Sequence, residues 1–376
     1  MTVHTPASPA ELAAILQAAA GTRLGVRGQG SRPAFHPVAD GWIDVTGLGG
    51  AIMHDPAELM LTAPAATPMA DIAARLAGTG QCLAFEPPDG SAAWSRGEGT
   101  NPGTLGGAVA CGLSGPRRAF AGAARDHVLA VSGVTGAGEL FNAGGKVLKN
   151  VTGFDLPRLL TGSRGSLAVL TAITVRLAPL PPATATLCLP ADDAARALRL
   201  MADALMVDGG ITGAAWANAM VHLRIEASAA ALPALMEALS ARLPAGSWLE
   251  GADSRALWAT LTNLGDVGAD QILWRCPLPA ARAAALALPA GAELRLDWGG
   301  ALAWIILPPA MADLDVPAMV AAAAGREGHA RRLRLPAGIV SSVPAISPAE
   351  PALAVLQQRI KALFDPAGVL AAEAVG

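Results

Sequence analysis

The first half of the chain combines short apolar runs with two stretches in which apolar residues recur at helical spacing. Ser8 and Pro9 are typical of a helix start, and the Ala/Leu-rich residues after them predict a helix. Met69, Ile72 and Leu76 fall on one face of a second helix. Strands are predicted at residues 24–28, 42–48, 58–63, 81–86, 128–134, 139–142, 146–150 and 167–177. The pattern therefore predicts an α+β unit over residues 1–178.

A proline-rich joint at residues 178–182 separates this unit from a second one, in which strand and helix patterns alternate. We expect strands at residues 185–190, 211–228, 271–279 and 300–308, and helices at residues 192–206 and 231–243. The alternation predicts a ferredoxin-like α+β cap domain over residues 183–340. A last helix is predicted from residue 351, in a segment, 341–376, that we expect to return to the first domain. No internal repeat is evident in the sequence.

Composition narrows the class of protein. A length of 376 residues favours two domains. Hydrophobic residues make up 52%, but much of this is alanine, and no apolar run reaches membrane-spanning length. The first 20 residues lack the basic start of a signal peptide. A net charge of −3 gives no reason to expect a nucleic-acid partner. Because neither a signal peptide nor a membrane-spanning run is evident in the sequence, a cytoplasmic location is the expectation.

The residues that usually bind metals are scattered. The four cysteines are too far apart in sequence for an iron–sulfur cluster or a Cys-based zinc site within the chain. They are Cys82, Cys111, Cys188 and Cys276. The six histidines show no HxH or HxxxH spacing, so no metal site is predicted. The chain contains no tyrosine, which excludes a catalytic phenol.

Clustered glycines over residues 99–177 are the most specific feature, because glycine turns form concave sites for anions such as a dinucleotide diphosphate. The common dinucleotide fingerprint is absent, since Gly28 and Gly30 are followed by a proline where the third glycine belongs. A hairpin turn explains the glycines of residues 136–138 better. Lys146 lacks the serine or threonine of a P-loop. The two commonest nucleotide-binding folds are therefore disfavoured.

Four segments nevertheless occur in a characteristic order, namely RGQGS at 27–31, EPP at 86–88, GTLGG at 103–107 and GFDLPRLLTGSRGSLAVLT at 153–171. Together they resemble the FAD-binding domain of the vanillyl-alcohol oxidase/p-cresol methylhydroxylase (PCMH) superfamily. The sequence KALFDPAGVL at 361–370 is similar to the closing helix of that family. The resemblance implies a two-part PCMH-type FAD-binding domain with a smaller cap.

The resemblance also implies which residues contact FAD. The first loop would wrap the diphosphate, the GTLGG turn would lie along the flavin and ribityl chain, and the last segment would lie near the adenine. The implied residues are Arg27, Gly28, Gln29, Gly30, Ser31, Pro87, Pro88, Gly103, Thr104, Gly106, Gly107, Gly112, Gly115, Gly165 and Val169. Some members attach the flavin to a histidine in the first loop. Here Gln29 and Ser31 stand at that place and His36 lies beyond the turn, so non-covalent FAD is expected.

Within the superfamily, residues 112–160 are similar to the FAD-binding subunit of glycolate oxidases. That similarity implies a complex that oxidises glycolate, a small 2-hydroxy acid, to glyoxylate. Its partners would be a sister FAD subunit and an iron–sulfur subunit, and these partners would hold the chain at the inner face of the membrane if the complex binds there. Direct catalysis and electron relay both stay open. The alternatives are a stand-alone FAD-dependent 2-hydroxy-acid oxidoreductase and a non-catalytic scaffold.

No residue is singled out as a catalytic base, but two polar clusters are candidates for binding. They are Arg117, Arg118, Arg125 and Asp126, and Lys146, Lys149 and Asn150. Arginine pairs with carboxylates in a bidentate manner, so the first cluster could contact substrate, cofactor phosphate or a partner subunit. The second could contact the flavin or serve packing.

Overall fold

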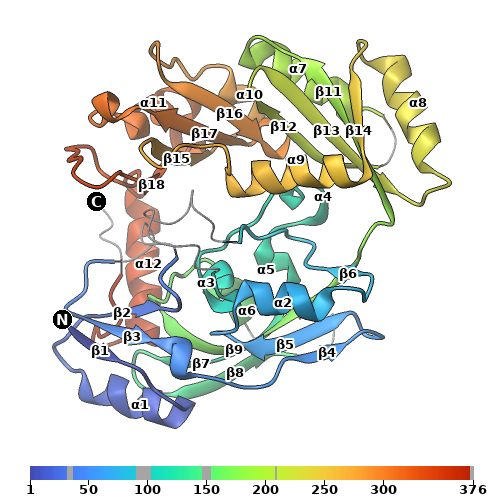
Figure 1. Cartoon of the computed structure of the whole chain (residues 1–376). Coiled ribbons are helices and arrows are strands. Elements are labelled where there is room, and N and C mark those ends of the chain that lie inside the picture. Colours follow the sequence, from blue (N-terminus) through green and yellow to red (C-terminus); the bar gives the residue numbers. More distant parts are fainter. Residues whose placement is uncertain (32–36, 90–102, 146–153, 208–209, 373–376) are drawn as a thin grey trace.

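The computed structural model describes residues 1–31, 37–89, 103–145, 154–207 and 210–372. Two α+β units lie one above the other, with the amino-terminal unit below and the cap above in Figure 1. The α+β class expected from the sequence is confirmed, because both units combine helices with strands.

A small parallel sheet begins the first unit. Its strands run in the order β1 (Thr2–His4), β3 (Gly41–Asp44) and β2 (Leu24–Arg27). Helix α1 (Pro9–Ala18) follows β1 and buries Leu12 and Leu16. The Ser8 side chain accepts a hydrogen bond from the backbone N–H of Glu11 at 3.2 Å, so the predicted helix start is confirmed.

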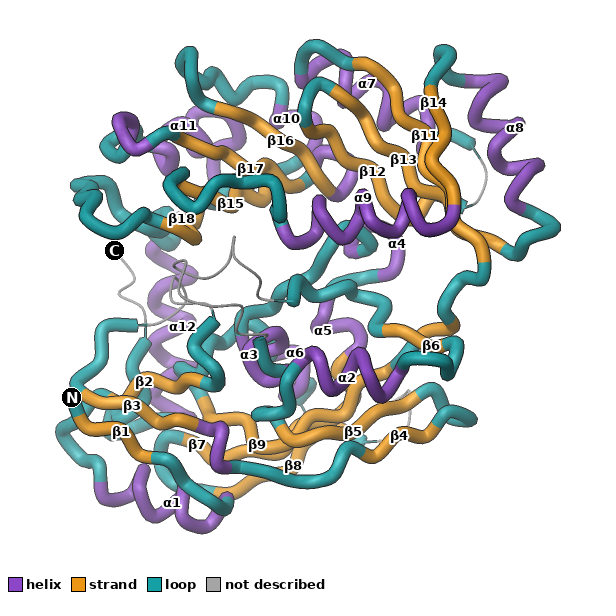
Figure 2. The backbone as a smooth tube through the Cα atoms, in the orientation of Figure 1, coloured by secondary structure: helices purple, strands orange, loops and turns teal. Residues whose placement is uncertain are grey.

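A five-stranded antiparallel sheet forms the floor of the first unit (Figure 2). Its order is β4 (Met53–Asp55), β5 (Met60–Pro64), β9 (Ala168–Arg176), β7 (Val128–Thr135) and β8 (Leu140–Gly144). Strands β7 and β8 form the predicted hairpin. A Cβ atom on Gly136 would collide with the side chain of Asp365, and one on Gly138 with Gln17. Close packing therefore explains these two glycines.

Short helices lie between this sheet and the cap (Figure 1). They are α2 (Met69–Leu76), α3 (Leu105–Ala110), α4 (Arg118–Ala121), α5 (Ala124–His127) and α6 (Leu156–Leu160). The core beneath them contains the fully buried side chains of Leu61, Ile72 and Leu105. A two-stranded sheet of β6 (Gln81–Cys82) and β10 (Ala178–Pro179) leads to the cap.

The cap sheet has eight strands from two successive βαββαβ units. The first unit contains β11 (Ala183–Pro190), α7 (Ala194–Leu205), β12 (Ile211–Ala217), β13 (Met220–Ala227), α8 (Leu232–Arg242) and β14 (Ser247–Glu250). The second contains β15 (Ile272–Pro277), α10 (Ala280–Ala283), β16 (Glu293–Asp297), β17 (Leu302–Leu307), α11 (Val316–Ala324) and β18 (Arg331–Arg334). Each has the ferredoxin-like strand pattern.

The spatial order β14-β11-β13-β12-β16-β17-β15-β18 shows how the two units join. In both halves of the sheet, the order from the outer edge inward is the fourth, first, third and second strand of the unit. The two halves meet where Trp216 of β12 pairs with Leu296 of β16. The cap is therefore ferredoxin-like, as the sequence predicts, but it contains two such units, a duplication that is not evident in the sequence. Helix α9 (Gly251–Asn263) links the units on the sheet face nearer the first domain (Figure 1).

The carboxyl-terminal segment contacts both units. Residues 345–347 still pair with the cap, because Arg332 N donates a hydrogen bond to Ala345 O at 2.7 Å. Helix α12 (Pro351–Phe364) then packs on the core of the first unit. Beyond it, Leu24 N donates to Val369 O at 2.7 Å. The end of the chain thus lies beside β2, the strand that leads into the candidate site.

Candidate functional site

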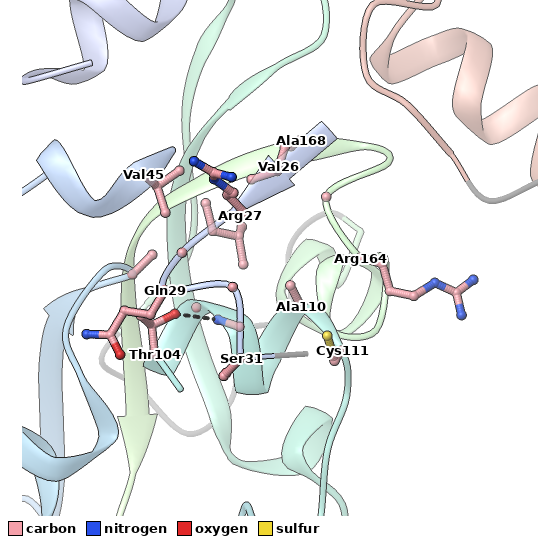
Figure 3. A pocket seen from close by; sticks show the side chains of 17 residues that line it. Val26, Arg27, Gln29, Ser31, Val45, Thr104, Ala110, Cys111, Arg164 and Ala168 are labelled. Atoms are coloured by element: carbon pink, nitrogen blue, oxygen red, sulfur yellow. Dashed lines mark hydrogen bonds between the residues drawn. The ribbon is translucent and has the colours of Figure 1, made fainter. Parts of the chain in front are cut away.

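A cleft lined by 17 residues lies between the loop after β2, the amino-terminal end of α3 and the start of β9 (Figure 3). Five of these residues are glycines and three are alanines, so much of its wall is backbone. We call it the glycine cleft. Its glycines are Gly28, Gly30, Gly106, Gly107 and Gly165. Arg27, Gln29, Ser31 and Thr104 also line it, so the structure brings nine of the predicted FAD-binding residues together.

Local sequence explains this shape. Thr104 is the N-cap of α3, and its Oγ1 accepts a hydrogen bond from Gly107 N at 3.0 Å. A Cβ atom on Gly28 would lie 2.9 Å from that same oxygen, so the loop can approach the helix only as glycine. Gly30 has a φ of +71° and open space where a Cβ would be, so its conformation selects glycine. The cleft therefore presents bare backbone on the loop side.

The charge of the glycine cleft suits an anion. In the described part of the chain, its only charged lining residues are Arg27 and Arg164. Arg27 pairs with Asp44 at 3.3 Å and stays partly exposed. The Arg164 side chain points away from the other labelled side chains in Figure 3. Backbone turns with cationic neighbours and no carboxylate among the described lining residues fit the diphosphate of a dinucleotide, so the residues present fit FAD.

The other predicted FAD-binding residues lie outside the cleft. Gly103 is buried directly before Thr104, and its N–H donates to Asp89 O. Pro87 lines an apolar groove beside α2, and Pro88 is buried next to it. Val169 is fully buried in β9 and belongs to the core against α1.

Gly112 and Gly115 follow α3. Gly112 lines a further cavity at the domain boundary, described below, and Gly115 lies against the cap. A Cβ atom on Gly112 would lie 3.3 Å from the Cα of Gly162, and one on Gly115 would collide with the carbonyl oxygen of Glu86. Gly115 therefore permits close packing at the domain boundary. Three residues singled out from the sequence, Lys146, Lys149 and Asn150, lie outside the described residues, as does His36.

A second cavity, of about 250 Å³, lies at the boundary between the two units. We call it the arginine pocket, after Arg118 and Arg125 from the first unit and Arg275 from β15 of the cap, which line it together with Trp298 and Cys111. Cys111 lines the glycine cleft as well, so the two cavities adjoin at the carboxyl-terminal end of α3. Sequence reasoning missed Arg275, since only the fold brings it to Arg118.

Trp298 organises this pocket. The Arg118 guanidinium carbon lies 4.4 Å from the centre of the Trp298 ring, and that of Arg275 lies 5.0 Å from it. The indole Nε1 donates a hydrogen bond across the domain boundary to Gly115 O at 2.9 Å. Trp298 has a φ of +57°, which is costly for a bulky residue. Asp297 Oδ1 stabilises this turn by accepting a hydrogen bond from Trp298 N at 2.7 Å.

Burial perturbs the charged groups around the pocket. It lowers the pKa of Arg275 to about 10, and the positive charges of Arg118 and Arg331 contribute to the shift. The guanidinium nevertheless remains protonated at neutral pH. Burial raises the pKa of the Asp297 carboxyl to about 7, and the charge of Glu86 adds to this.

Arg117, predicted with Arg118 and Arg125 as one cluster, belongs to a different structure. Its guanidinium pairs with Glu226 at 2.6 Å and with Glu86 at 3.0 Å. Arg224 donates to both carboxylate oxygens of Glu86 at 2.9 Å. We call these four residues the interdomain ion network, because Glu86 and Arg117 come from the first unit and Arg224 and Glu226 from β13 of the cap.

The described residues contain no group of three or more His, Cys, Asp or Glu side chains placed to hold a metal ion. No disulfide bond joins any two of Cys82, Cys111, Cys188 and Cys276. Among the described helices, none has both the length and the apolar character needed to cross a membrane.

Comparisons with known proteins agree with this architecture. A family model described as an FAD binding domain matches residues 2–144. The solved structure of an alkyldihydroxyacetonephosphate synthase aligns with a TM-score of 0.66 at 13% identity, over 98% of this chain and 76% of that one, which supports the fold alone. The family model and the glycine cleft thus define an FAD-binding protein with a PCMH-type fold.

Sequence similarity narrows the family. Glycolate oxidase subunit GlcE of Escherichia coli (strain K12) is 34% identical over 350 residues, which cover 93% of this chain and 91% of that protein. Glycolate oxidase subunit GlcD of Bacillus subtilis (strain 168) is 38% identical over 84 residues, 22% of this chain and 18% of that one. The chain belongs to the GlcE family, as the resemblance implied, and its FAD cofactor is confirmed.

Proposed function

We propose that this chain is the FAD-binding subunit of a complex that oxidises glycolate to glyoxylate, and that it holds FAD without a covalent bond in the glycine cleft. The observation that carries the proposal is the cleft itself, in which nine residues from three separate sequence segments meet around bare backbone. The full-length similarity to a glycolate oxidase subunit supports the substrate.

The residues have distinct roles in holding FAD. The loop of Gly28–Gln29–Gly30 offers backbone N–H groups to the diphosphate, and Arg27 adds positive charge nearby. The hydroxyl of Thr104 accepts a hydrogen bond from Gly107, which leaves its hydrogen for the ligand. When bound, FAD supplies the acceptor for the two electrons of the substrate. A sister FAD subunit and an iron–sulfur subunit would carry the electrons onward, since the cysteines of this chain are scattered.

Flavin content tests the cofactor site. Purified full-length chain is expected to show the visible flavin spectrum, and acid precipitation is expected to release the colour. Gly28→Val pushes a branched side chain against Thr104 and is expected to weaken FAD affinity at least tenfold, or about 1.4 kcal/mol. Gly49→Val is the matched control, because Gly49 is exposed with open space around its Cβ position. Equal flavin content in both variants would place FAD elsewhere.

A second function, that of a stand-alone 2-hydroxy-acid oxidoreductase, is favoured by one observation, since the arginine pocket is built from this chain alone. Titration with glycolate separates the two functions. If the flavin of the isolated chain bleaches, the chain is self-sufficient. If it bleaches only after a sister subunit is added, the complex is the working unit. A chain without flavin absorbance would be a scaffold.

A further inference from the structure

We propose that the arginine pocket binds the carboxylate of the 2-hydroxy acid, through Arg118 and Arg125 on one side and Arg275 on the other. This inference rests on the proposed function and extends it, because it assigns substrate recognition to this chain itself. From the sequence alone, the ligand of Arg118 and Arg125 stays open among substrate, cofactor phosphate and a partner subunit.

The three arginines lack paired counter-ions among the described residues. No carboxylate in that part of the chain forms an ion pair within 4.0 Å of the guanidinium of Arg118, Arg125 or Arg275. Arg118 and Arg275 are half-buried and Arg125 is exposed, whereas two arginines that are more deeply buried in the cap are paired. Arg224 pairs with Glu86 at 2.9 Å, and Arg295 pairs with Asp266 at 2.7 Å. Guanidinium groups offer five N–H donors in a planar fork that matches a carboxylate, so an unpaired set facing one cavity suits an anionic ligand.

The cluster of positive charge is also costly without a ligand. Arg118 and Arg275 each lie within 5.0 Å of the centre of the Trp298 ring, so two like charges are held close together. The pKa of each guanidinium is lowered, by burial first and by neighbouring arginines second. The charges of Asp126 near Arg118 and of Asp297 near Arg275 act in the opposite direction, and the pKa of each guanidinium is nevertheless lowered. A bound carboxylate would offset this cost, as expected of a site arranged for a ligand.

The arginine pocket also lies in a suitable position. The glycine cleft meets the amino-terminal end of α3, and the arginine pocket adjoins the cleft at Cys111, just beyond its other end. Six residues of helix span about 9 Å. An acid bound by the arginines would thus lie next to the cofactor site, at the boundary with the cap. This is where recognition of the carboxylate would orient the carbon to be oxidised.

Binding of oxalate, a small dicarboxylate that cannot be oxidised as an alcohol, tests the pocket in the full-length chain. Calorimetry is expected to show that Arg118→Met and Arg275→Met each weaken oxalate binding at least tenfold at unchanged flavin content. Arg275→Lys should recover part of the affinity, because it keeps the charge but not the fork. Arg282→Met, on the exposed surface of α10, is the control and should bind like the wild type.

Thermal stability without oxalate separates a binding role from a structural one. Removing one of several repelling charges should leave the melting temperature of Arg275→Met equal or higher, whereas a structural arginine would lower it. Oxalate binding unaffected by both methionine variants, or absent in the wild type, would overturn the pocket. If oxalate binding depends on the arginines but glycolate is never oxidised with any partner, the pocket stands and the proposed function fails.

Discussion

Asp297 is expected to make the stability of this protein fall as the pH rises toward neutrality. Its carboxyl is buried, and its pKa is raised from 3.8 to about 7, by burial first and by the charge of Glu86 second. The hydrogen bond from Trp298 N opposes the shift most strongly, and the charges of Arg224 and Arg275 oppose it as well. Asp297→Asn removes the titration but keeps the side-chain oxygen that accepts the hydrogen bond from Trp298 N.

Proton linkage sets the sign of the effect. Between the unfolded and folded pKa values, the folded protein holds a proton that the unfolded chain has lost, so raising the pH favours unfolding. The stabilisation is fully present below pH 3.8 and is lost as the pH passes through 7. One pKa unit corresponds to about 1.4 kcal/mol, so Asp297 should contribute a loss of about 3 kcal/mol between pH 5 and pH 8.

Urea denaturation of the wild type and Asp297→Asn at pH 5, 6, 7 and 8 measures this loss. The difference between the two proteins isolates Asp297, because every other titrating group is common to both. The free energy of unfolding of Asp297→Asn minus that of the wild type should rise by about 3 kcal/mol from pH 5 to pH 8. Added salt should change the difference little, because burial causes it. Parallel stability curves across this pH range would refute the reasoning.

Two further predictions concern the domain boundary. Arg224→Met should lower the free energy of unfolding by about 3–5 kcal/mol, because it leaves the carboxylates of Glu86 and Glu226 short of a partner. The double variant Glu86→Gln/Arg224→Met should lose less than the sum of its two single variants. Urea denaturation of the three variants measures these losses. Gly115→Ala should destabilise by about 1–3 kcal/mol, because its Cβ would meet the carbonyl of Glu86, while Gly49→Ala should not; thermal melting compares them.

Local features were predictable because neighbouring residues decide them. The helix after Ser8 carries its own cap, and the turn between β7 and β8 contains Gly138 with a φ of +76°, so both follow from a few positions. The loop at 27–31 could also be assigned, because Gly30 has a positive φ, a backbone conformation that favours glycine. The family resemblance then brought distant loops together into one cleft.

Long-range features could not be predicted in the same way. The duplicated cap escaped notice because its second half uses short pieces such as β16 and β18, of five and four residues, which lack a clear period. Arg117 and Arg118 are adjacent in sequence and chemically alike, yet one joins the ion network and the other the pocket. The position of the cap determines which of these two structures each arginine joins.

The interdomain ion network and the arginine pocket lie at the same domain boundary but differ in net charge. In the network, two arginines face two carboxylates, so the charges cancel and all four side chains can be largely buried. In the pocket, three arginines gather with no paired carboxylate in the described chain. Repulsion of this kind would separate the two units unless other contacts held them together. The network and the hydrogen bond from Trp298 to Gly115 provide those contacts. The boundary is therefore neutral where it joins the domains and cationic only where a cavity leaves room for an anion, which is the departure from ordinary packing that marks a functional site.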